Sequence, residues 1–398
     1  MILEPSRHEL AARRTRLLDA LAREQAPGIC LFSPLHILYL TDFAFIPTER
    51  PLALILNAGG ATTLFVPRLE KEHAESFADA NRVVAYPEYP GDVHPMSHLQ
   101  NLLIELGLAR GTLAVDRDGY AGGFGYRGPA LSELLPQIRI VKIGDVLDRL
   151  MSVKSAEEIA LLRESARWGQ LAHELLQRYT AAGQTELEIS ERACREATEQ
   201  MVATLGPAYR PHGWMSAGAY AGFRGQIGPH SAVPHALITN ARIQPSDVLV
   251  TGATAGMAGY YSELERTMVV APVSKDVEHF FSLMLGAQET ALEALRPGRS
   301  CAEVDRAVRR FYEANDLMAY WRHHTGHAIG MGVPNHAAPY LDTGDATEIQ
   351  PGMVFSIEPG IYVPGLGGFR HSDTVVVTES GPEPLTTYPR DLGSLTLT

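Results

Sequence analysis

The sequence of 398 residues predicts two domains, an α/β domain followed by an α+β domain. Short runs rich in β-branched and aromatic residues, at 28–33, 51–57, 62–67 and 82–87, lie among turn-forming and helix-forming segments. Longer helical segments and then further strand-like runs occupy the C-terminal half. With 45% hydrophobic and 20% charged residues, the chain has the composition of a globular protein with two sizeable cores.

The N-terminal domain is predicted to begin with a helix over about residues 8–25, because its leucines recur on one face. The four strand-like runs follow it. A helix near 96–108 and another strand at 112–116 then continue the alternation of strands and helices.

The boundary between the domains is marked by a capping-box pattern. Ser155 is a good helix N-cap, and Glu158 stands three residues after it at the start of a long amphipathic segment. We therefore expect the first domain to span 1–153 and the second to span 154–398.

The second domain is predicted to combine long helices with strands that close a curved sheet. The expected elements are helices up to about residue 205, strands and a hairpin over 236–272, helices at 275–295 and 301–316, and strands at 352–363 and 369–380. Because side chains alternate along a strand, Glu263 and Glu265 should face the same side, with Leu264 behind them. Such a pair is consistent with a functional cleft, although the same alternation also suits an exposed edge strand.

Charge and cysteine content limit the classes of partner. The net charge of -12 and the isoelectric point near 5.7 argue against nucleic acid. Three irregularly spaced cysteines indicate a reducing compartment without a disulfide framework. The N-terminus is charged, unlike a signal peptide, and no run reaches the roughly eighteen apolar residues of a membrane span. We therefore expect a cytoplasmic protein that acts on a small molecule, with neither nucleic acid nor membrane as partner.

Four sequence blocks resemble the C-terminal half of the creatinase/prolidase/methionine-aminopeptidase superfamily. They are GYYSELERT (259–267), TGHAIGMG (325–332), SIEPGIY (356–362) and GGFRHSD (367–373). The resemblance implies that the second domain has the pita-bread fold of that superfamily. In its metallopeptidase members, two Asp, one His and two Glu from such blocks hold a pair of divalent metal ions.

The ligand positions implied by this resemblance are incompletely filled. His327 and Glu358 match family ligands, and Glu263 replaces a shorter Asp. Gly252 and Ser372 stand where the family has carboxylates. Because divalent metals need several oxygen ligands in a suitable geometry, a two-metal site is not expected. The sequence thus predicts an enzyme without metal or other cofactor.

The first block most resembles that of creatinase-like hydrolases, which work without metal. In them two Glu bind a guanidinium group, and these positions correspond to Glu265 and Glu358. Two convergent carboxylates can accept bidentate hydrogen bonds from such a planar cation. The family's proton-shuttling His falls on His235, which we expect to be the general acid and base, with His327 as a further catalytic residue.

The resemblance also implies residues that bind the substrate. Arg50 holds the position of an Arg that reaches the substrate carboxylate from the neighbouring subunit, which implies a homodimer. Thr48 replaces a nearby aromatic residue of that family. Tyr261 matches a pocket tyrosine, His336 falls on a His of the peptidase members, and Glu263 should line the same cleft.

Together these residues predict metal-independent hydrolysis of a C–N bond in a small carboxylate-bearing amidine, guanidine or amide, in a creatinase-like or ectoine-hydrolase-like reaction. Two alternatives stay open. One is an Xaa-Pro dipeptidase or aminopeptidase with a rebuilt metal site on Glu263, His327 and Glu358. Asp373 or His371 could add a ligand to that site. The other is a non-catalytic binding protein on the same scaffold.

Overall fold

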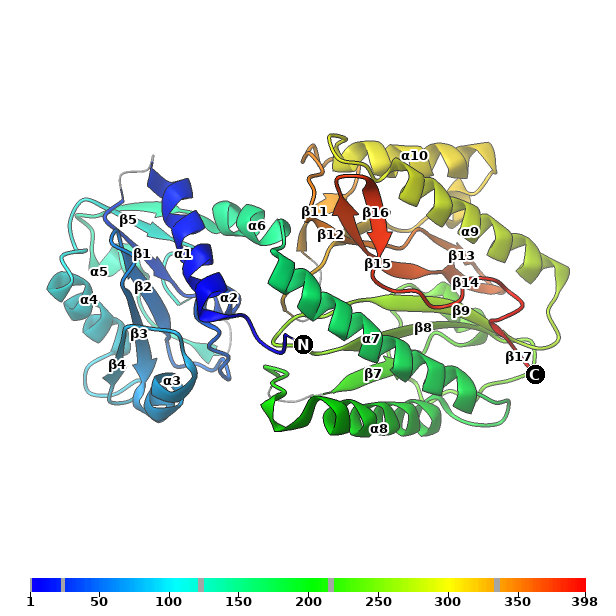
Figure 1. Cartoon of the computed structure of the whole chain (residues 1–398), viewed down its shortest axis with the longest axis horizontal. Helices are drawn as coiled ribbons and strands as arrows, with labels where there is room; N and C mark the ends of the chain where they lie inside the picture. The colour runs from blue at the N-terminus through cyan, green and yellow to red at the C-terminus, as the bar shows by residue number, and fades with distance from the viewer. Residues whose placement is uncertain (1, 23–25, 121–124, 214–217, 333–336) are drawn as a thin grey trace. The chain divides into compact units, whose positions relative to one another are not determined.

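The computed structural model describes residues 2–22, 26–120, 125–213, 218–332 and 337–398. The chain divides into two compact units, one formed by Glu4–Met151 and the other containing Ser152–Thr398. Each unit has its own main sheet (Figure 1). The four sequence blocks identified above all lie in the second unit.

The first unit is built on a six-stranded sheet of mixed direction. Its strands are β1 (Gly28–Leu31), β2 (Ala53–Asn57), β3 (Thr62–Pro67), β4 (Arg82–Tyr86), β5 (Thr112–Val115) and β6 (Arg139–Lys142). The described helices are α1 (Arg7–Leu21), α2 (Pro34–Thr41), the 3-10 turn η2 (Arg68–Glu70), α3 (Lys71–Phe77), α4 (Pro95–Glu105), α5 (Leu131–Leu134) and α6 (Gly144–Ser152). The strand order is β4-β3-β2-β1-β5-β6, with antiparallel pairing only at β1–β2 and β2–β3.

The second unit contains a nine-stranded sheet and a separate two-stranded ribbon. The sheet strands are β7 (Ala219–Gly222), β8 (Val248–Ala255), β9 (Leu264–Val270), β10 (Gly326–Ala328), β11 (Ala337–Leu341), β12 (Val354–Ile357), β15 (Ser372–Thr378), β16 (Gly381–Pro384) and β17 (Thr396–Leu397). The ribbon strands are β13 (Gly360–Val363) and β14 (Gly367–Arg370). The main path runs β11-β10-β12-β15-β9-β8-β7, so β11 and β7 lie at its two ends.

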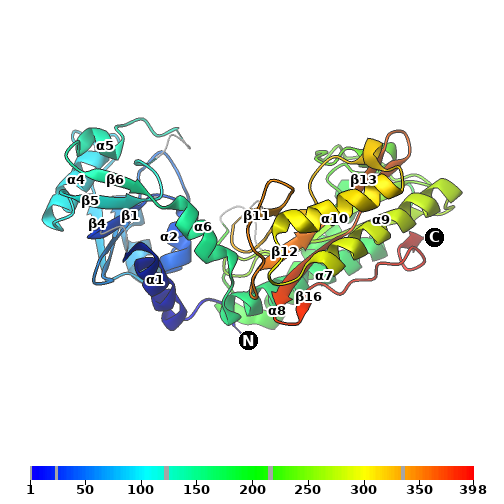
Figure 2. The ribbon, with the colours of Figure 1, turned by 90° about the horizontal axis from the view of Figure 1, so that it is seen from above.

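Four long helices accompany this sheet. They are α7 (Ala156–Tyr179), α8 (Glu186–Leu205), α9 (Lys275–Ala294) and α10 (Cys301–Ala314), with 3-10 turns η4 (Gly206–Ala208), η5 (Gly228–Ala232) and η6 (Met318–Tyr320). Helices α9 and α10 lie side by side in both views (Figure 2). Helix α7 begins with the predicted capping box, in which Ser155 and Glu158 bond to each other's backbone N–H groups. In the described part of the chain, no helix has the length and apolar character needed to span a bilayer.

At the start of β9, two carboxylates face a cavity and the residue between them packs in the hydrophobic core. Leu264 is buried, and Glu263 and Glu265 on either side of it both line one cavity, as alternation along a strand requires. On the neighbouring strands, Ser372 and Gly252 both stand opposite Glu265. Since adjacent strands lie about 4.8 Å apart, side chains from β8, β9 and β15 can meet on this face.

Candidate active site

A small cavity opens where the central strands of the second unit end. Its volume is about 120 Å³. The residues that line it are Arg224, His235, Glu263, Glu265, His323, His324, Glu358 and Arg370. They come from segments that are far apart in sequence, between the loop after β7 and the end of β14. The sheet therefore gathers acidic, basic and imidazole groups around one enclosed space, which is the usual setting of an active site.

Two carboxylates and one imidazole converge at the base of this cavity. The ligand atoms of Glu263, His327 and Glu358 all lie within 4.8 Å of one another. The His327 Nε2 atom is 3.2 Å from Glu358 Oε1 and 3.8 Å from Glu263 Oε2. Burial opposes the charged form of His327, but the close contact with Glu358 and the negative charges of Glu263 and Glu358 raise its pKa to about 9.

Glu263 is held in place by two serine hydroxyls. The hydroxyls of Ser356 and Ser372 donate to Glu263 Oε1 at 2.6 and 2.7 Å. Its other oxygen, Oε2, faces His327. Ser372, where the metallopeptidase pattern has a Glu, therefore orients a carboxylate instead of supplying one.

Glu265 belongs to a buried ion-pair network. Arg370 donates to both oxygens of Glu265, from Nε to Oε2 and from Nη2 to Oε1 at 2.6 Å. Arg224 adds a third bond, from Nη2 to Oε1 at 3.0 Å. Burial works against the charge of Arg370, but Glu265 raises the Arg370 pKa well above its ordinary value. The two oxygens of Glu265 are thus engaged by arginines of the chain itself and are not available as a clamp for a cationic substrate.

Tyr362 supports the same network from β13. Its hydroxyl accepts a hydrogen bond from Arg370 Nη1 at 2.9 Å and lies 2.8 Å from His323 Nε2. The Arg370 guanidinium is consequently fixed on three sides, by Glu265, by Tyr362 and, at 3.8 Å, by Glu358.

His235 faces the cavity from the segment that follows η5. Its side chain is exposed, and no described residue forms a hydrogen bond with its ring. The imidazole is therefore near the carboxylates and open to a substrate. The structure thus places His235, Glu263, Glu265 and Glu358 around one cavity, with His327 in contact with two of them.

Four other residues expected at the site are not among the described residues that line the cavity. Tyr261 is not among the described residues that line the cavity, and its backbone N–H donates to the Gly330 carbonyl. Arg50 and Thr48 belong to the first unit, where Arg50 pairs with two glutamates and the Thr48 hydroxyl accepts from the Arg50 N–H. His336 lies outside the described residues.

Asp373 and His371 are directed away from the cavity. The Asp373 carboxylate accepts hydrogen bonds from Arg266 at 2.8 Å, Thr386 at 2.7 Å and Gln288 at 3.0 Å. His371 is buried, with Nδ1 accepting from the Thr267 N–H and Nε2 close to the Arg390 carbonyl. Neither can complete a metal site at Glu263.

Four cavity residues, Arg224, His323, His324 and Arg370, were not among the predicted site residues. Arg224 follows β7 in the left-handed backbone region, with φ of 53°, and nothing local in the sequence marks it as a partner of Glu265. His324 lines the cavity next to His323, and the adjacent pair of histidines just before the block TGHAIGMG was the available signal.

Comparison with known families identifies both parts of the chain. Residues 160–379 match the model of metallopeptidase family M24, and residues 13–153 match that of the creatinase/prolidase N-terminal domain. The chain belongs to metallopeptidase family M24. The match confirms the predicted superfamily and the predicted fold, an α/β N-terminal domain followed by a pita-bread catalytic domain.

The proteins to which this chain is similar are named as peptidases. An uncharacterized peptidase from Staphylococcus aureus strain USA300 is 27% identical over 381 residues, covering 94% of this chain and 99% of the relative. The structure of dipeptidase PepE from Mycobacterium ulcerans is 29% identical, covers 99% of both chains and superposes with a TM-score of 0.79. A prolidase from Thermococcus sibiricus is 26% identical, covers 98% of both chains and has a TM-score of 0.80.

These findings correct the expected activity. The family and its named relatives are peptidases, so the prediction of a metal-independent, creatinase-like amidinohydrolase is wrong. The site gives the physical reason, because Glu265, one of the two expected guanidinium ligands, is occupied by Arg370 and Arg224. The coarser prediction, a hydrolase that cleaves a C–N bond, holds.

The residues of this M24 member fit one divalent metal ion. Two ligands that are each about 2.1 Å from a tetrahedral ion lie about 3.4 Å apart. The observed separations of 3.2 and 3.8 Å around His327 bracket that value. The described residues supply no ligand set for a second ion, because Gly252 and Ser372 offer no carboxylate and Asp373 is engaged elsewhere.

Proposed function

We propose that this M24 family member is a peptidase that hydrolyses small peptides with a free C-terminal carboxylate, using one divalent ion held by Glu263, His327 and Glu358. The observation that carries the proposal is the convergence of these three donors within 4.8 Å at the base of a small cavity. The likeness to a dipeptidase and a prolidase supports peptides as the substrate class. The cavity volume of about 120 Å³ favours a short substrate.

A divalent ion in such a site polarises a carbonyl oxygen and lowers the pKa of bound water. The chain's own residues prepare the ligand set. Ser356 and Ser372 fix Glu263 so that Oε2 points toward His327. Buried Arg370 lies 3.8 Å from Glu358 and restricts its orientation. These contacts hold the donors in position before a substrate arrives.

Arg224 is suited to bind the substrate carboxylate. Its side chain is 39% exposed and lines the cavity. Its Nη2 atom bonds to Glu265 and Gln226, whereas no described residue bonds to Nε or Nη1. The Nε and Nη1 groups can thus each donate a charge-assisted hydrogen bond to a substrate carboxylate. Because Arg370 also pairs with Glu265, that carboxylate offsets the charge of Arg224 only in part.

His235 is suited to transfer a proton to the leaving amine. Its exposed ring borders the same cavity as Glu263 and Glu358. An imidazole within reach of the scissile bond can donate a proton to the departing nitrogen. His235→Ala should therefore lower kcat more than it raises KM.

The expected homodimer forms part of this proposal. Arg50 from one chain would complete the pocket of its neighbour, with Thr48 beside it. In the structure Arg50 pairs with Glu49 and, at 3.1 Å, with Glu88. Arg50 would have to exchange these partners for a substrate, and solvent screens its pair with the exposed Glu88.

The test is peptide hydrolysis under controlled metal content. Purified protein is stripped with chelator, reloaded with Mn²⁺, Zn²⁺ or Co²⁺, and assayed with Xaa-Pro and other dipeptides. We expect hydrolysis that is lost on stripping, restored on reloading and abolished in Glu358→Gln. Glu379→Gln, an equal change of charge at an exposed turn, is the matched control. Hydrolysis that is unaffected by stripping, or no hydrolysis of any dipeptide in the loaded protein, would overturn the proposal.

A further inference from the structure

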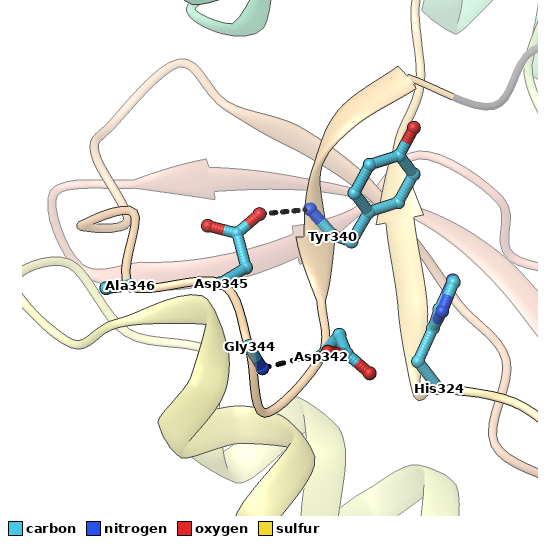
Figure 3. A pocket seen from close by; sticks show the side chains of 6 residues that line it. All are labelled: His324, Tyr340, Asp342, Gly344, Asp345 and Ala346. Atoms are coloured by element: carbon cyan, nitrogen blue, oxygen red, sulfur yellow. Dashed lines mark hydrogen bonds between the residues drawn. The ribbon is translucent and has the colours of Figure 1, made fainter.

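A second and larger cavity adjoins the candidate active site. Its volume is about 490 Å³, and its lining residues are His324, Tyr340, Asp342, Gly344, Asp345 and Ala346 (Figure 3). His324 lines both cavities. A substrate that fills the small cavity can therefore extend past His324 into the larger one, which we call the β11 pocket.

The β11 pocket lies toward one end of the strand order, and Arg224 follows the strand at the other end. Tyr340 is on β11, and Asp342 follows in the adjoining turn. From β11 the path passes β10, which carries His327, and later β9, which carries Glu265, before it reaches β7. A peptide whose carboxylate is on Arg224 and whose scissile bond is near His327 would thus direct its N-terminal part toward β11.

Aromatic surface forms one part of the pocket. The rings of His324 and Tyr340 have centroids 5.7 Å apart and an interplanar angle of 52°. Tyr340 is 39% exposed, and its ring borders the same space as His324 and Asp342 (Figure 3). An exposed aromatic face attracts cationic groups through its quadrupole.

Carboxylates form the other part. Asp345 accepts hydrogen bonds from the backbone N–H groups of Tyr340 and Thr347 at 2.8 and 2.9 Å. Burial opposes its charge, but the Thr347 side chain and these two backbone groups together lower its pKa. The Asp342 Oδ1 atom accepts from the Gly344 N–H at 2.8 Å. Its Oδ2 atom is 3.9 Å from Arg309 Nη2, too far for a hydrogen bond.

Arg309 neutralises this pocket only in part, because its charge is shared between Asp305 and Asp342. Its Nε atom donates to Asp305 at 2.7 Å, and its guanidinium stacks over the Trp321 ring at 4.2 Å. The residues described as lining the pocket include two Asp and neither Lys nor Arg. Arg306 also lies nearby, since its Nη2 atom donates to the Thr343 carbonyl at 3.2 Å. The pocket is thus lined by carboxylate and aromatic groups and open to solvent.

We infer that the β11 pocket binds the cationic side chain of a lysine or arginine at the N-terminal side of the scissile bond, with the charge near Asp342 and the aliphatic stem against Tyr340 and His324. The inference rests on the proposed peptidase function for its orientation. A volume of about 490 Å³ accommodates a whole basic residue, whereas the smaller cavity holds the groups next to the scissile bond. The preferred substrates are accordingly short peptides with a basic N-terminal residue.

The test measures binding without catalysis. Lysinol and norleucinol are amino alcohols without a cleavable amide, and they differ in the side-chain charge. Dissociation constants are obtained by ligand-observed NMR titration of the full chain. We expect wild-type protein to bind lysinol at least fivefold more tightly than norleucinol. Asp342→Asn should remove most of that difference and leave norleucinol binding unchanged, and Tyr340→Ala should weaken lysinol binding by several-fold.

Asp19→Asn, the same change on the exposed face of α1, is the control and should leave both ligands unaffected. Equal binding of lysinol and norleucinol by wild-type protein would overturn the inference, even if dipeptides are hydrolysed. Equal weakening of both ligands by Asp342→Asn would overturn it as well. If lysinol binding depends on Asp342 but no dipeptide is cleaved, the proposed reaction fails and the cationic site stands.

Discussion

Replacing Arg370 with methionine tests whether Glu265 is a structural partner or a substrate ligand. Arg370 is 3% exposed and makes a two-point ion pair with Glu265, which is itself buried. Methionine retains the apolar stem and removes the charge, so Glu265 keeps only Arg224 as a cationic partner. Removing one member of a buried ion pair costs about 3–5 kcal/mol, because the remaining charge is left without its main partner.

The assay is urea unfolding, followed by fluorescence and circular dichroism. For a slope of about 2–3 kcal/mol/M, this loss lowers the unfolding midpoint of the second unit by about 1–2.5 M urea. The double variant Arg370→Met with Glu265→Gln should be less destabilised than Arg370→Met alone, since no buried charge is left over. Arg224→Met is the matched control, because that side chain is 39% exposed and its loss should cost about 1 kcal/mol or less. A cost below about 1 kcal/mol for Arg370→Met, or a double variant no more stable than the single one, would refute the reasoning.

Three further predictions concern substrate binding, pH dependence and assembly. Arg224→Gln should raise KM for dipeptides by about tenfold but leave KM for their C-terminal amides nearly unchanged, since a charge-assisted pair contributes about 1.5–3 kcal/mol; an equal rise for both sets would contradict its role. Burial, and to a lesser extent Arg266, lower the pKa of His173 to about 3, so the unfolded chain takes up a proton below pH 6.5 that the folded chain does not. The free energy of unfolding should therefore fall as the pH drops from 6.5, by about 2 kcal/mol at pH 5. Urea unfolding at pH 7.5 and pH 5 measures this loss, and His173→Gln should remove the part that His173 causes. An equal loss in wild type and His173→Gln would show that His173 is not its source. Mixing and refolding inactive Arg50→Ala with inactive Glu358→Gln chains should restore about a quarter of wild-type activity, because half of the dimers then have one complete site; no recovery would exclude a shared site.

Local patterns predicted several elements closely. The capping box at Ser155 and Glu158 marks the start of α7, and the predicted helices at 275–295 and 301–316 are α9 and α10 within two residues. Such signals depend only on neighbours in sequence, so they can be found without the fold. The first helix ends at Leu21 instead of near residue 25, because helix ends are set by packing as well as by propensity.

Alternation along a strand predicted that Glu263 and Glu265 share a face, but not what they contact. Glu265 pairs with Arg370, which is 105 positions away in sequence and on a separate ribbon. The same limit applies to Ser372. The sequence indicated that a carboxylate ligand was missing there, whereas only the fold places the serine hydroxyl on Glu263. Pairings between distant strands follow from sheet topology, which a single sequence does not specify.

The central claim is that one divalent ion, and not two, binds between Glu263, His327 and Glu358. It is tested most directly by an anomalous difference map from crystals of the protein soaked in Mn²⁺. The account predicts one peak about 2.1 Å from His327 Nε2 and from an oxygen of each glutamate, absent in Glu358→Gln crystals. Two peaks about 3.5–4 Å apart, or no peak at this position, would contradict it.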